Sequence, residues 1–300
     1  MLKTHRRTNM KRQLLIAFAV FIFAAGPVFA GHSLAGNEGT DDASSVSLSA
    51  SAENIVAGES VRLTFSLKDK DGKPLQNLAI MHDRILHVII ISSDFAFFSH
   101  IHPEDFATIT DSMKKDARFS VDYVFPKAGR FLIALDYAVG ERAYSKRLFV
   151  SVSGKEQLGK ISKDLTRTKQ FGSYSVTLKS EPDRIVNGKP VKLIYEIGQD
   201  GRPVADIEPY LSAAMHIAVV QANLDSFIHA HGDAPGMEDH SAHAGHGMAS
   251  MGHIHGTVQK QYGPFIESTV VFPTKGLYQI FGEFKHHGQV VLTRFMVEVE

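Results

Sequence analysis

An internal duplication is the feature that most constrains this chain. The segment "DGKPL" at residues 71–75 matches "DGRPV" at 200–204, an offset of 129 residues. Further along, "FPKAGRFLIALDY" at 125–137 matches "FPTKGLYQIFGEF" at 272–284, an offset of 147, so the second copy carries 18 extra residues between the two matches. Since 300 residues are also more than one hydrophobic core usually organises, the sequence predicts two domains of the same kind.

Both copies consist of short runs rich in Val, Ile, Phe and Tyr. These runs lie at 60–67, 86–92, 118–125, 130–137 and 146–152 in the first copy, and at 175–180, 190–197, 215–222, 267–272, 277–284 and 293–300 in the second. Turn formers such as "KDGKP" and "PKAG" separate them, and no long stretch has helical periodicity. The pattern predicts an all-β fold: two tandem immunoglobulin-like antiparallel β-sandwiches at 46–153 and 171–300, joined by a linker at 154–170.

The amino terminus predicts export. Residues 1–30 contain five basic residues and no acidic one, with an apolar run from Leu14 to Ala25 and small residues before position 31. This order is typical of a secretory signal peptide cleaved after Ala30, followed by a flexible leader at 31–45. An uncleaved membrane anchor is the alternative, although a run of 12 apolar residues is short for a bilayer. The route, Sec or Tat, stays open, and we expect a periplasmic or extracellular protein with no membrane span in the mature chain.

Charge and cysteine content exclude several functions. Without residues 1–30 the chain has 27 basic and 32 acidic residues, a net charge of −5, so it has no electrostatic reason to bind nucleic acid. It contains no cysteine, which excludes disulfides, thiolate chemistry and a lipid-modified cysteine. Any metal must therefore be bound by nitrogen, oxygen or thioether ligands.

Three histidines recur in register at the offset of 129 residues: His87, His100 and His102 in the first copy, and His216, His229 and His231 in the second. Side chains two apart on a strand point to the same face, and antiparallel neighbours bring Cβ atoms to about 5 Å. Three imidazoles can then reach one ion at the usual metal–nitrogen distance of about 2.0–2.1 Å. The spacing predicts a three-histidine metal site in each copy. A hydrogen-bonded histidine cluster, or a site lost in one copy, is the alternative.

Two weaker candidates accompany the triples. Met81 and His82 precede the strand in the first copy and could form an ancillary ligand pair there. Asp136 and Glu283 correspond at the offset of 147, so a carboxylate near each site is conceivable. A strand position that faces solvent is the preferred interpretation of these two acids.

The extra residues of the second copy fall in a loop at 232–257, "GDAPGMEDHSAHAGHGMASMGHIHGT". Its candidate metal ligands are His240, His243, His246, Met248, Met251, His253 and His255, and it also contains Met237. Glycine-rich and poor in aliphatic residues, the loop cannot form a packed core. Histidine with methionine and without cysteine favours copper, while zinc would use the histidines alone. We expect the loop to capture copper or deliver it to the second triple; a linker that is merely histidine-rich is the alternative.

The segments "LHVIIISSDFAFFSHIHPEDF" and "MHIAVVQANLDSFIHAHG", with the "YGPFIESTVVFPTKGLYQIFGEF" that follows, resemble bacterial exported proteins of the YtkA-like type. That resemblance covers most of each repeat and implies small immunoglobulin-like domains associated with copper or heavy-metal handling. The architecture is also similar to periplasmic copper-resistance proteins of the CopC type. Their amino-terminal histidine ligand would here require cleavage after Gly31, which exposes His32, rather than after Ala30.

These observations predict an exported, non-enzymatic protein that binds, buffers or transfers copper, with zinc as the second metal. Its expected partners are metal ions and another envelope metal-transport protein. A cell-envelope interaction or adhesion module with no metal role is the main alternative. A zinc-dependent hydrolase is the minor one, because three histidines and a water on zinc form a hydrolytic site in other folds, whereas no general base or nucleophile accompanies these triples.

Overall fold

A computed structural model describes residues 44–236 and 261–300. Both repeats belong to one compact unit, Gly31–Glu300. Within the described residues we find no helix with the length and apolar character needed to span a membrane. The segment 1–43, with the predicted signal peptide and most of the leader, lies outside the described residues.

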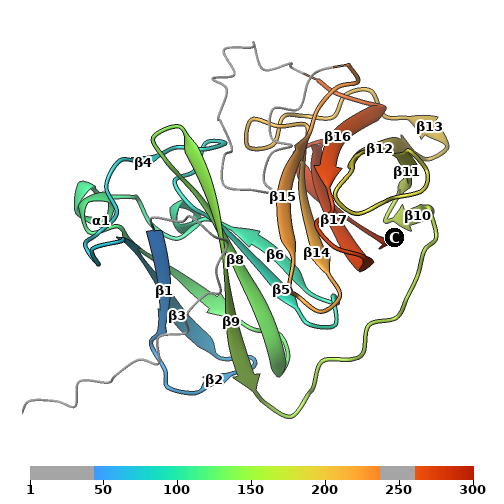
Figure 1. The fold of residues 1–300 in the computed structure, drawn as a ribbon. Helices are drawn as coiled ribbons and strands as arrows, with labels where there is room; N and C mark the ends of the chain where they lie inside the picture. The colour runs from blue at the N-terminus through green and yellow to red at the C-terminus, as the bar shows by residue number, and fades with distance from the viewer. Residues whose placement is uncertain (1–43, 237–260) are drawn as a thin grey trace, which may run out of the picture. The chain divides into compact units, whose positions relative to one another are not determined.

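The first repeat is a sandwich of two sheets (Figure 1). One sheet has the order β1-β3-β7, and the other β2-β9-β8-β5-β6, with β4 paired to β8. The strands are β1 (Ser44–Ala50), β2 (Ile55–Val56), β3 (Ser60–Asp69), β4 (Leu78–Ala79), β5 (His87–Ser92), β6 (Phe98–Ile101), β7 (Arg118–Val124), β8 (Gly129–Val139) and β9 (Arg142–Ser153). A 3-10 turn, Pro103–Asp105, and a short helix, α1 (Asp111–Lys115), connect β6 to β7.

The second repeat is built on the same plan. One sheet has the order β10-β11-β12-β13, with β16 also paired to β12, and the other has the order β15-β14-β17-β18. The strands are β10 (Thr168–Phe171), β11 (Tyr174–Glu181), β12 (Pro190–Gln199), β13 (Arg202–Pro203), β14 (Met215–Gln221), β15 (Phe227–Gly232), β16 (Phe265–Val271), β17 (Gly276–His286) and β18 (Gln289–Val299). The predicted fold class, two tandem immunoglobulin-like antiparallel sandwiches, is confirmed.

Alternation along the strands explains the two sandwich cores. In β3, Leu63, Phe65 and Leu67 are fully or almost fully buried, and they pack in the core of the first repeat. In the second repeat, Tyr195 of β12 is likewise fully buried and packs in the sandwich core. Residues two apart on a strand share a face, so the alternating apolar residues of β3 and β12 face the sandwich cores.

Strands β5 and β14 depart from this pattern, because every residue of both is buried. Their inner faces belong to the two sandwich cores, and their outer faces belong to a third core shared by the repeats. That core contains Ile89, Ile91, Phe95, Leu132 and Ala134 from the first repeat, and Ala218, Val220, Leu224, Phe281 and Met296 from the second. Continuous apolar runs are what a strand buried on both faces requires.

Polar contacts around the shared core are reciprocal. Arg147 of β9 donates to the carbonyl oxygen of Leu224 at 2.8 Å, and Arg294 of β18 donates to the carbonyl oxygen of Ala96 at 2.9 Å. The two arginines correspond at the offset of 147 residues. Each repeat therefore presents the same patch to the other, which is the arrangement of an isologous interface.

Two predicted boundaries move slightly. Strand β1 begins at Ser44, so the last two residues of the predicted leader pair with β3. Strand β10 begins at Thr168, so the last three residues of the predicted linker belong to the second sandwich and pair with β11. Both shifts arise because polar residues can join an edge strand through backbone hydrogen bonds alone.

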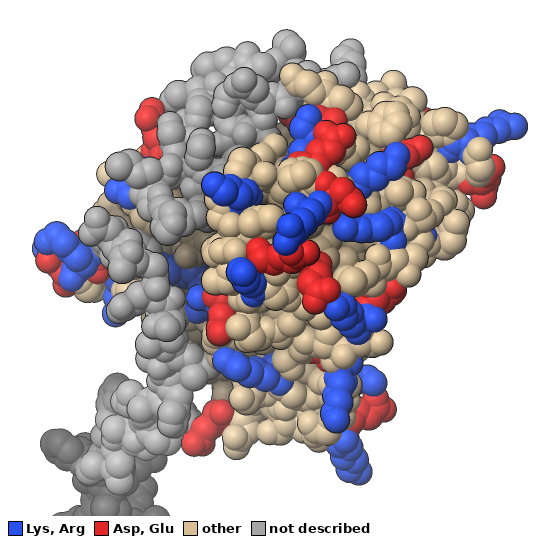
Figure 2. Space-filling view, turned by 45° about the vertical axis from the view of Figure 1, so that its right-hand side comes forward, with Lys and Arg blue, Asp and Glu red and all other residues tan. Residues whose placement is uncertain are grey.

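Acidic and basic side chains are intermixed on the face of the molecule drawn in Figure 2. Surface ion pairs such as Lys179–Glu196 and Lys192–Glu267 join neighbouring strands of the second repeat. Such pairs contribute little to stability individually. This face carries no single-sign field of the kind that attracts nucleic acid.

Gly263 provides a test of the second sandwich. Its φ is +99°, and a Cβ at this position would overlap the carbonyl oxygen of Val204. We expect Gly263→Ala to lower the free energy of unfolding by about 2–4 kcal/mol, from the left-handed backbone and the overlap together. The control is Gly201→Ala, with a φ of +77° and open space around the added methyl. For Gly201→Ala we expect the free energy of unfolding to fall by about 1–2 kcal/mol. Urea denaturation measures both variants. Equal losses at the two positions would contradict the close approach of Gly263 to the carbonyl oxygen of Val204.

Candidate metal centre

Strand pairing brings the histidines of each repeat onto one face. In the second repeat, His216 of β14 lies opposite His231 of β15, and His229 lies opposite Ala218. In the first, β5 and β6 pair in the same antiparallel manner, with His100 opposite Ile89. The predicted antiparallel neighbours are therefore confirmed in both repeats.

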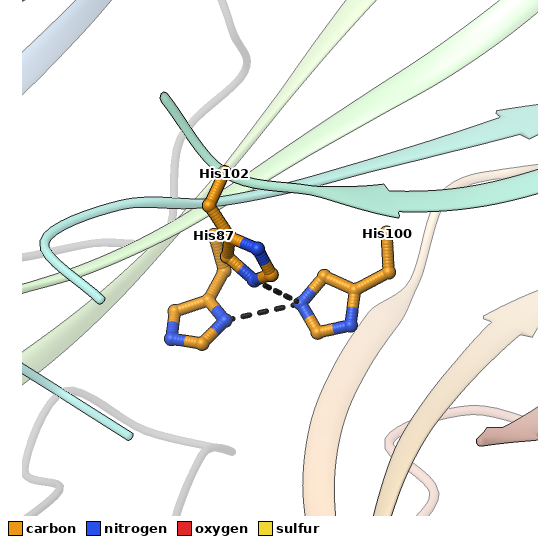
Figure 3. Close-up of side chains that lie close together, drawn as sticks. All are labelled: His87, His100 and His102. Atoms are coloured by element: carbon orange, nitrogen blue, oxygen red, sulfur yellow. Dashed lines mark hydrogen bonds between the residues drawn. The ribbon is translucent and has the colours of Figure 1, made fainter. Parts of the chain in front are cut away.

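The first triad, His87, His100 and His102, converges on one point (Figure 3). His87 Nδ1 lies 3.0 Å from His100 Nε2, and His102 Nε2 lies 3.2 Å from the same atom. Nitrogens held tetrahedrally by one ion at about 2.0–2.1 Å are about 3.3–3.4 Å apart. The three nitrogens are thus close to the separation that a shared metal imposes.

The outer nitrogens of this triad have fixed partners. His87 Nε2 donates to the carbonyl oxygen of Met81 at 2.9 Å, so His87 Nδ1 is left with its lone pair. His102 Nδ1 lies 3.0 Å from Asp105 Oδ2, which likewise leaves His102 Nε2 free of hydrogen. His100 Nε2 can supply at most one hydrogen to these two lone pairs. A cation satisfies all three nitrogens at once, as in metal sites whose imidazoles are anchored by carboxylates and carbonyls.

The second triad has similar ring spacings, but its nitrogens converge less: the group within 4.8 Å there is His216 and His229 with His100 of the first repeat, without His231. The ring centroids of His216 and His229 are 5.6 Å apart, against 5.3 Å for His87 and His100. The ring centroid of His231 lies 4.7 Å from that of His216 and 4.8 Å from that of His229. The centroid of His102 lies 4.9 Å from that of His87 and 4.7 Å from that of His100.

Hydrogen bonding in the second triad follows the first at His216 and His229 but differs at His231. His216 Nε2 donates to the carbonyl oxygen of Tyr210 at 3.0 Å, and His216 Nδ1 lies 3.4 Å from His229 Nε2. Both ring nitrogens of His231 are buried without a hydrogen-bond partner among the described residues. A buried polar atom without a partner is uncommon and points to a missing ligand or water.

Each triad is completed by an acid of the other repeat. His100 Nδ1 lies 3.0 Å from Glu283 Oε2, and His229 Nδ1 lies 2.6 Å from Asp136 Oδ2. The two carboxyl side chains are only 12% and 6% exposed. The expectation that these strand positions face solvent was therefore wrong, because the second sandwich covers the outer face of β8 and the first covers that of β17.

Burial dominates the electrostatics of the site. It lowers the pKa of His102 to about 4, against an opposing effect of Asp105. Burial, together with neighbouring imidazoles, also holds the pKa values of His87 and His100 well below the usual range. The same causes lower the pKa values of His216 and His231. These five rings are neutral at pH 7, which is the state that binds metal.

Glu283 responds in the opposite sense, since burial raises its pKa to about 8. In the metal-free site this carboxyl group holds a proton at neutral pH. A cation on the neighbouring His100 would favour the ionised form of Glu283, and binding of such a cation would then release a proton.

His82 also belongs to the cluster. Its ring stacks on His231 with 3.7 Å between centroids, and burial lowers its pKa to about 4. The predicted ancillary role of Met81 and His82 takes a different form: Met81 contributes its carbonyl oxygen, and His82 approaches the second triad instead of the first. In the second repeat Leu211 occupies the place that corresponds to His82.

A separate group lies at the turn between β17 and β18. Asp206 Oδ1 is 2.9 Å from His286 Nε2, and Asp206 Oδ2 is 3.7 Å from His287 Nε2. His287 lies in the turn itself, whereas His286 ends β17 and is buried. His286 Nδ1 also contacts the Tyr174 hydroxyl at 2.9 Å. With both of its ring nitrogens engaged, His286 serves to tie this turn to β11.

The structure thus gathers all six predicted triple histidines and adds Asp105, Asp136, Glu283 and His82, which sequence reasoning left out or ranked low. The predicted loop ligands, which are His240, His243, His246, Met248, Met251, His253 and His255, lie outside the described residues. No local pattern identifies Asp136 or Glu283 as partners of histidines more than 90 residues away. Their mutual correspondence across the repeats is the one sequence signal that could have drawn attention to them.

Solved structures similar to this chain include the Escherichia coli adhesin FdeC, with 14% identity, a TM-score of 0.24, and coverage of 88% of this chain and 66% of that one. The Yersinia pseudotuberculosis adhesin InvE has 11% identity, a TM-score of 0.22, and coverage of 84% and 58%. Native Escherichia coli alpha-2-macroglobulin has 11% identity, a TM-score of 0.25, and coverage of 88% and 14%. The chain spans less than two thirds of each of these proteins, and likenesses of this degree carry no inference about function.

No curated protein matches the chain. A family match is present, and it falls on both repeats. Residues 39–154 and 168–300 match a domain of unknown function, DUF8832. These two segments contain all six histidines of the two triads and each of the described strands. Since they cover most of the sequence, the chain belongs to the DUF8832 family.

Proposed function

We propose that this protein is an exported, non-enzymatic metal-binding protein that takes up copper at its two histidine triads. The observation that carries the proposal is the convergence of His87 Nδ1 and His102 Nε2, both without hydrogen, on His100 Nε2 at 3.0 and 3.2 Å. Neutral imidazoles in a buried site, each anchored through its other nitrogen, are an arrangement that metal ions stabilise and that apolar packing does not require.

Copper is preferred over zinc for two reasons. Imidazole binds both, but divalent copper binds a given nitrogen site more tightly than zinc does. The loop between β15 and β16 adds methionine to histidine in the sequence, and thioether ligands favour the cuprous ion. Export follows from the amino-terminal sequence, and transfer to an envelope transport protein is the partner interaction that such a carrier needs. The resemblance to YtkA-like and CopC-type proteins is consistent with this role.

A cell-envelope interaction or adhesion module is the alternative that the sequence leaves open. The histidines would then serve to hold the two repeats together as a hydrogen-bonded cluster. Two of the solved structures with a similar fold are bacterial adhesins, but the fold alone does not assign their role to this chain. The buried, unpartnered nitrogens of His231 favour metal binding over a completed hydrogen-bond cluster.

The test is metal analysis of the purified mature chain after loading with copper or zinc and removal of loosely bound ions. One variant carries His102→Ala and His231→Ala, and a second has residues 237–256 replaced by a Gly/Ser segment of equal length. The second variant keeps Asp233, whose backbone pairs with Glu267. The control is His287→Ala, whose side chain is 70% exposed.

Copper that remains in the loop variant and the control, but is lost from the folded double variant, supports the proposal. Absence of copper from every form would refute it and favour the interaction module. Copper that disappears only with the loop would show that the triads are structural. Circular dichroism of each variant identifies a variant that fails to fold, in which case His102→Gln and His231→Gln replace the alanines.

Asp105 gives a prediction of its own. Asp105→Ala removes the acceptor that orients His102 Nδ1, so we expect copper affinity to fall by about 10–100-fold, the usual effect of losing such a partner. The control is Asp111→Ala on the exposed face of α1, which should leave affinity unchanged. Competition titration against a coloured copper chelator measures both. Equal affinities for the two variants would show that Asp105 does not orient a metal ligand.

A further inference from the structure

The two triads lie against each other across the interface between the repeats. The centroid of His100 is 5.3 Å from that of His216 and 5.5 Å from that of His229, both in the other repeat. One ligand nitrogen from each of these three rings lies within 4.8 Å of the others. A metal-competent group thus already contains histidines from both repeats.

This proximity limits the distance between two bound ions. An ion about 2.0–2.1 Å from a ring nitrogen lies about 3 Å from the centroid of that ring. Since the nearest rings of the two triads are 5.3 Å apart, the ions would be no more than about 12 Å apart. Two paramagnetic ions at that range perturb each other measurably.

The carboxylates are exchanged between the triads. Within its own repeat, Asp136 lies beside His87 in the β5–β8 pairing, and Glu283 lies beside His216 in the β14–β17 pairing. Their hydrogen bonds are nevertheless made with the other repeat: Asp136 Oδ2 pairs with His229 Nδ1, and Glu283 Oε2 pairs with His100 Nδ1. Each triad therefore depends on the opposite repeat for the group that orients its central imidazole.

We propose that the two triads form one two-metal centre, in which each ion is bound by the histidines of one repeat and oriented by the carboxylate of the other. This rests on the proposed metal-binding function. The chemical class of ligand is a pair of transition-metal ions that accept nitrogen donors. Occupancy of the centre holds the repeats together, because neither site is complete in one repeat alone.

The decisive experiment compares copper affinities of single-triad chains, with residues 237–256 replaced by the Gly/Ser segment so that only the triads bind. A chain with His87→Ala and His102→Ala keeps the second triad. In it we expect Asp136→Ala to lower affinity by about 10–100-fold and Glu283→Ala to leave it within about threefold. A chain with His216→Ala and His231→Ala keeps the first triad, and there the two effects should be reversed.

The conservative changes Asp136→Asn and Glu283→Gln keep an acceptor oxygen and replace the alanines where a variant does not fold. If each carboxylate affects copper affinity only at the triad of its own repeat, the proposal that each repeat orients the other's triad is wrong, although the protein still binds copper. If no single-triad or intact chain binds copper, the proposed function itself has failed.

Electron paramagnetic resonance of the cupric form tests the shared centre. With both triads intact and two ions bound, we expect the spectrum to be broadened or reduced by coupling between the ions, and the single-triad chains to give uncoupled spectra. Two ions per chain with an uncoupled spectrum would overturn the two-metal centre while leaving copper binding intact.

Discussion

Phe281→Ala is expected to lower the free energy of unfolding by about 3–5 kcal/mol, the usual cost of removing a fully buried aromatic ring. Phe281 is 0% exposed and lies in the core shared by the two repeats. Its ring stacks on Phe98 at 4.6 Å and meets Phe95 edge-on at 6.4 Å, so truncation leaves a cavity bounded by both repeats. Urea denaturation of the metal-free protein measures the loss.

The control for this change is Phe265→Ala in β16, a ring that is 40% exposed. There we expect a loss of less than about 1 kcal/mol, because little apolar area leaves water at this position on folding. If the two substitutions cost the same, Phe281 does not occupy a packed interface, and the repeats are not held together by the shared core.

Acidification from pH 6.5 to pH 4 is expected to destabilise the metal-free protein by several kcal/mol. The pKa values of His82 and His102 are lowered to about 4, mainly by burial, and four more histidines of the cluster shift in the same direction. In the unfolded chain these rings take up protons near pH 6.5. The stability contributed by keeping them neutral is thus fully present above pH 6.5 and is lost as pH falls through that range.

One group acts in the opposite sense. Glu283, with its pKa raised to about 8, binds a proton in the folded state before it does so in the unfolded chain, and so favours folding as pH falls from 8 to its unfolded value. It is one group against six, so the net effect below pH 6.5 remains destabilising.

Urea denaturation at a series of pH values measures this dependence. The matched variant is His82→Leu, which introduces the residue type that stands at the corresponding position, Leu211, in the second repeat. We expect it to retain about 3 kcal/mol more of its stability than the parent between pH 6.5 and 4, since each unit of pKa shift corresponds to about 1.4 kcal/mol. A stability that does not change over this range would show that the cluster is hydrated and not buried.

Much of the fold could be predicted from local pattern. The alternation in β3 and the continuous apolar runs of β5 and β14 depend on short-range periodicity, which sequence displays directly. Because the sequence is duplicated, the same succession of strands is predicted twice, once from each copy. Boundaries were less accurate, since Ser44 and Thr168 join strands by backbone pairing and carry no apolar signal.

The candidate site divides in the same way. The spacing of His100 and His102, and its recurrence in His229 and His231, places each pair on one face of a strand, because side chains two apart point the same way. The spacing does not indicate which part of the protein packs against the face that carries the histidines.

Sequence by itself therefore determined two like sandwiches and a three-histidine face on each. Only the tertiary structure decided that these faces meet, that Asp136 and Glu283 cross to the opposite repeat, and that His82 stacks on His231. The physical reason is range: strand periodicity and residue spacing are local, whereas docking depends on the summed burial of apolar side chains from both repeats, which no segment of either repeat encodes alone.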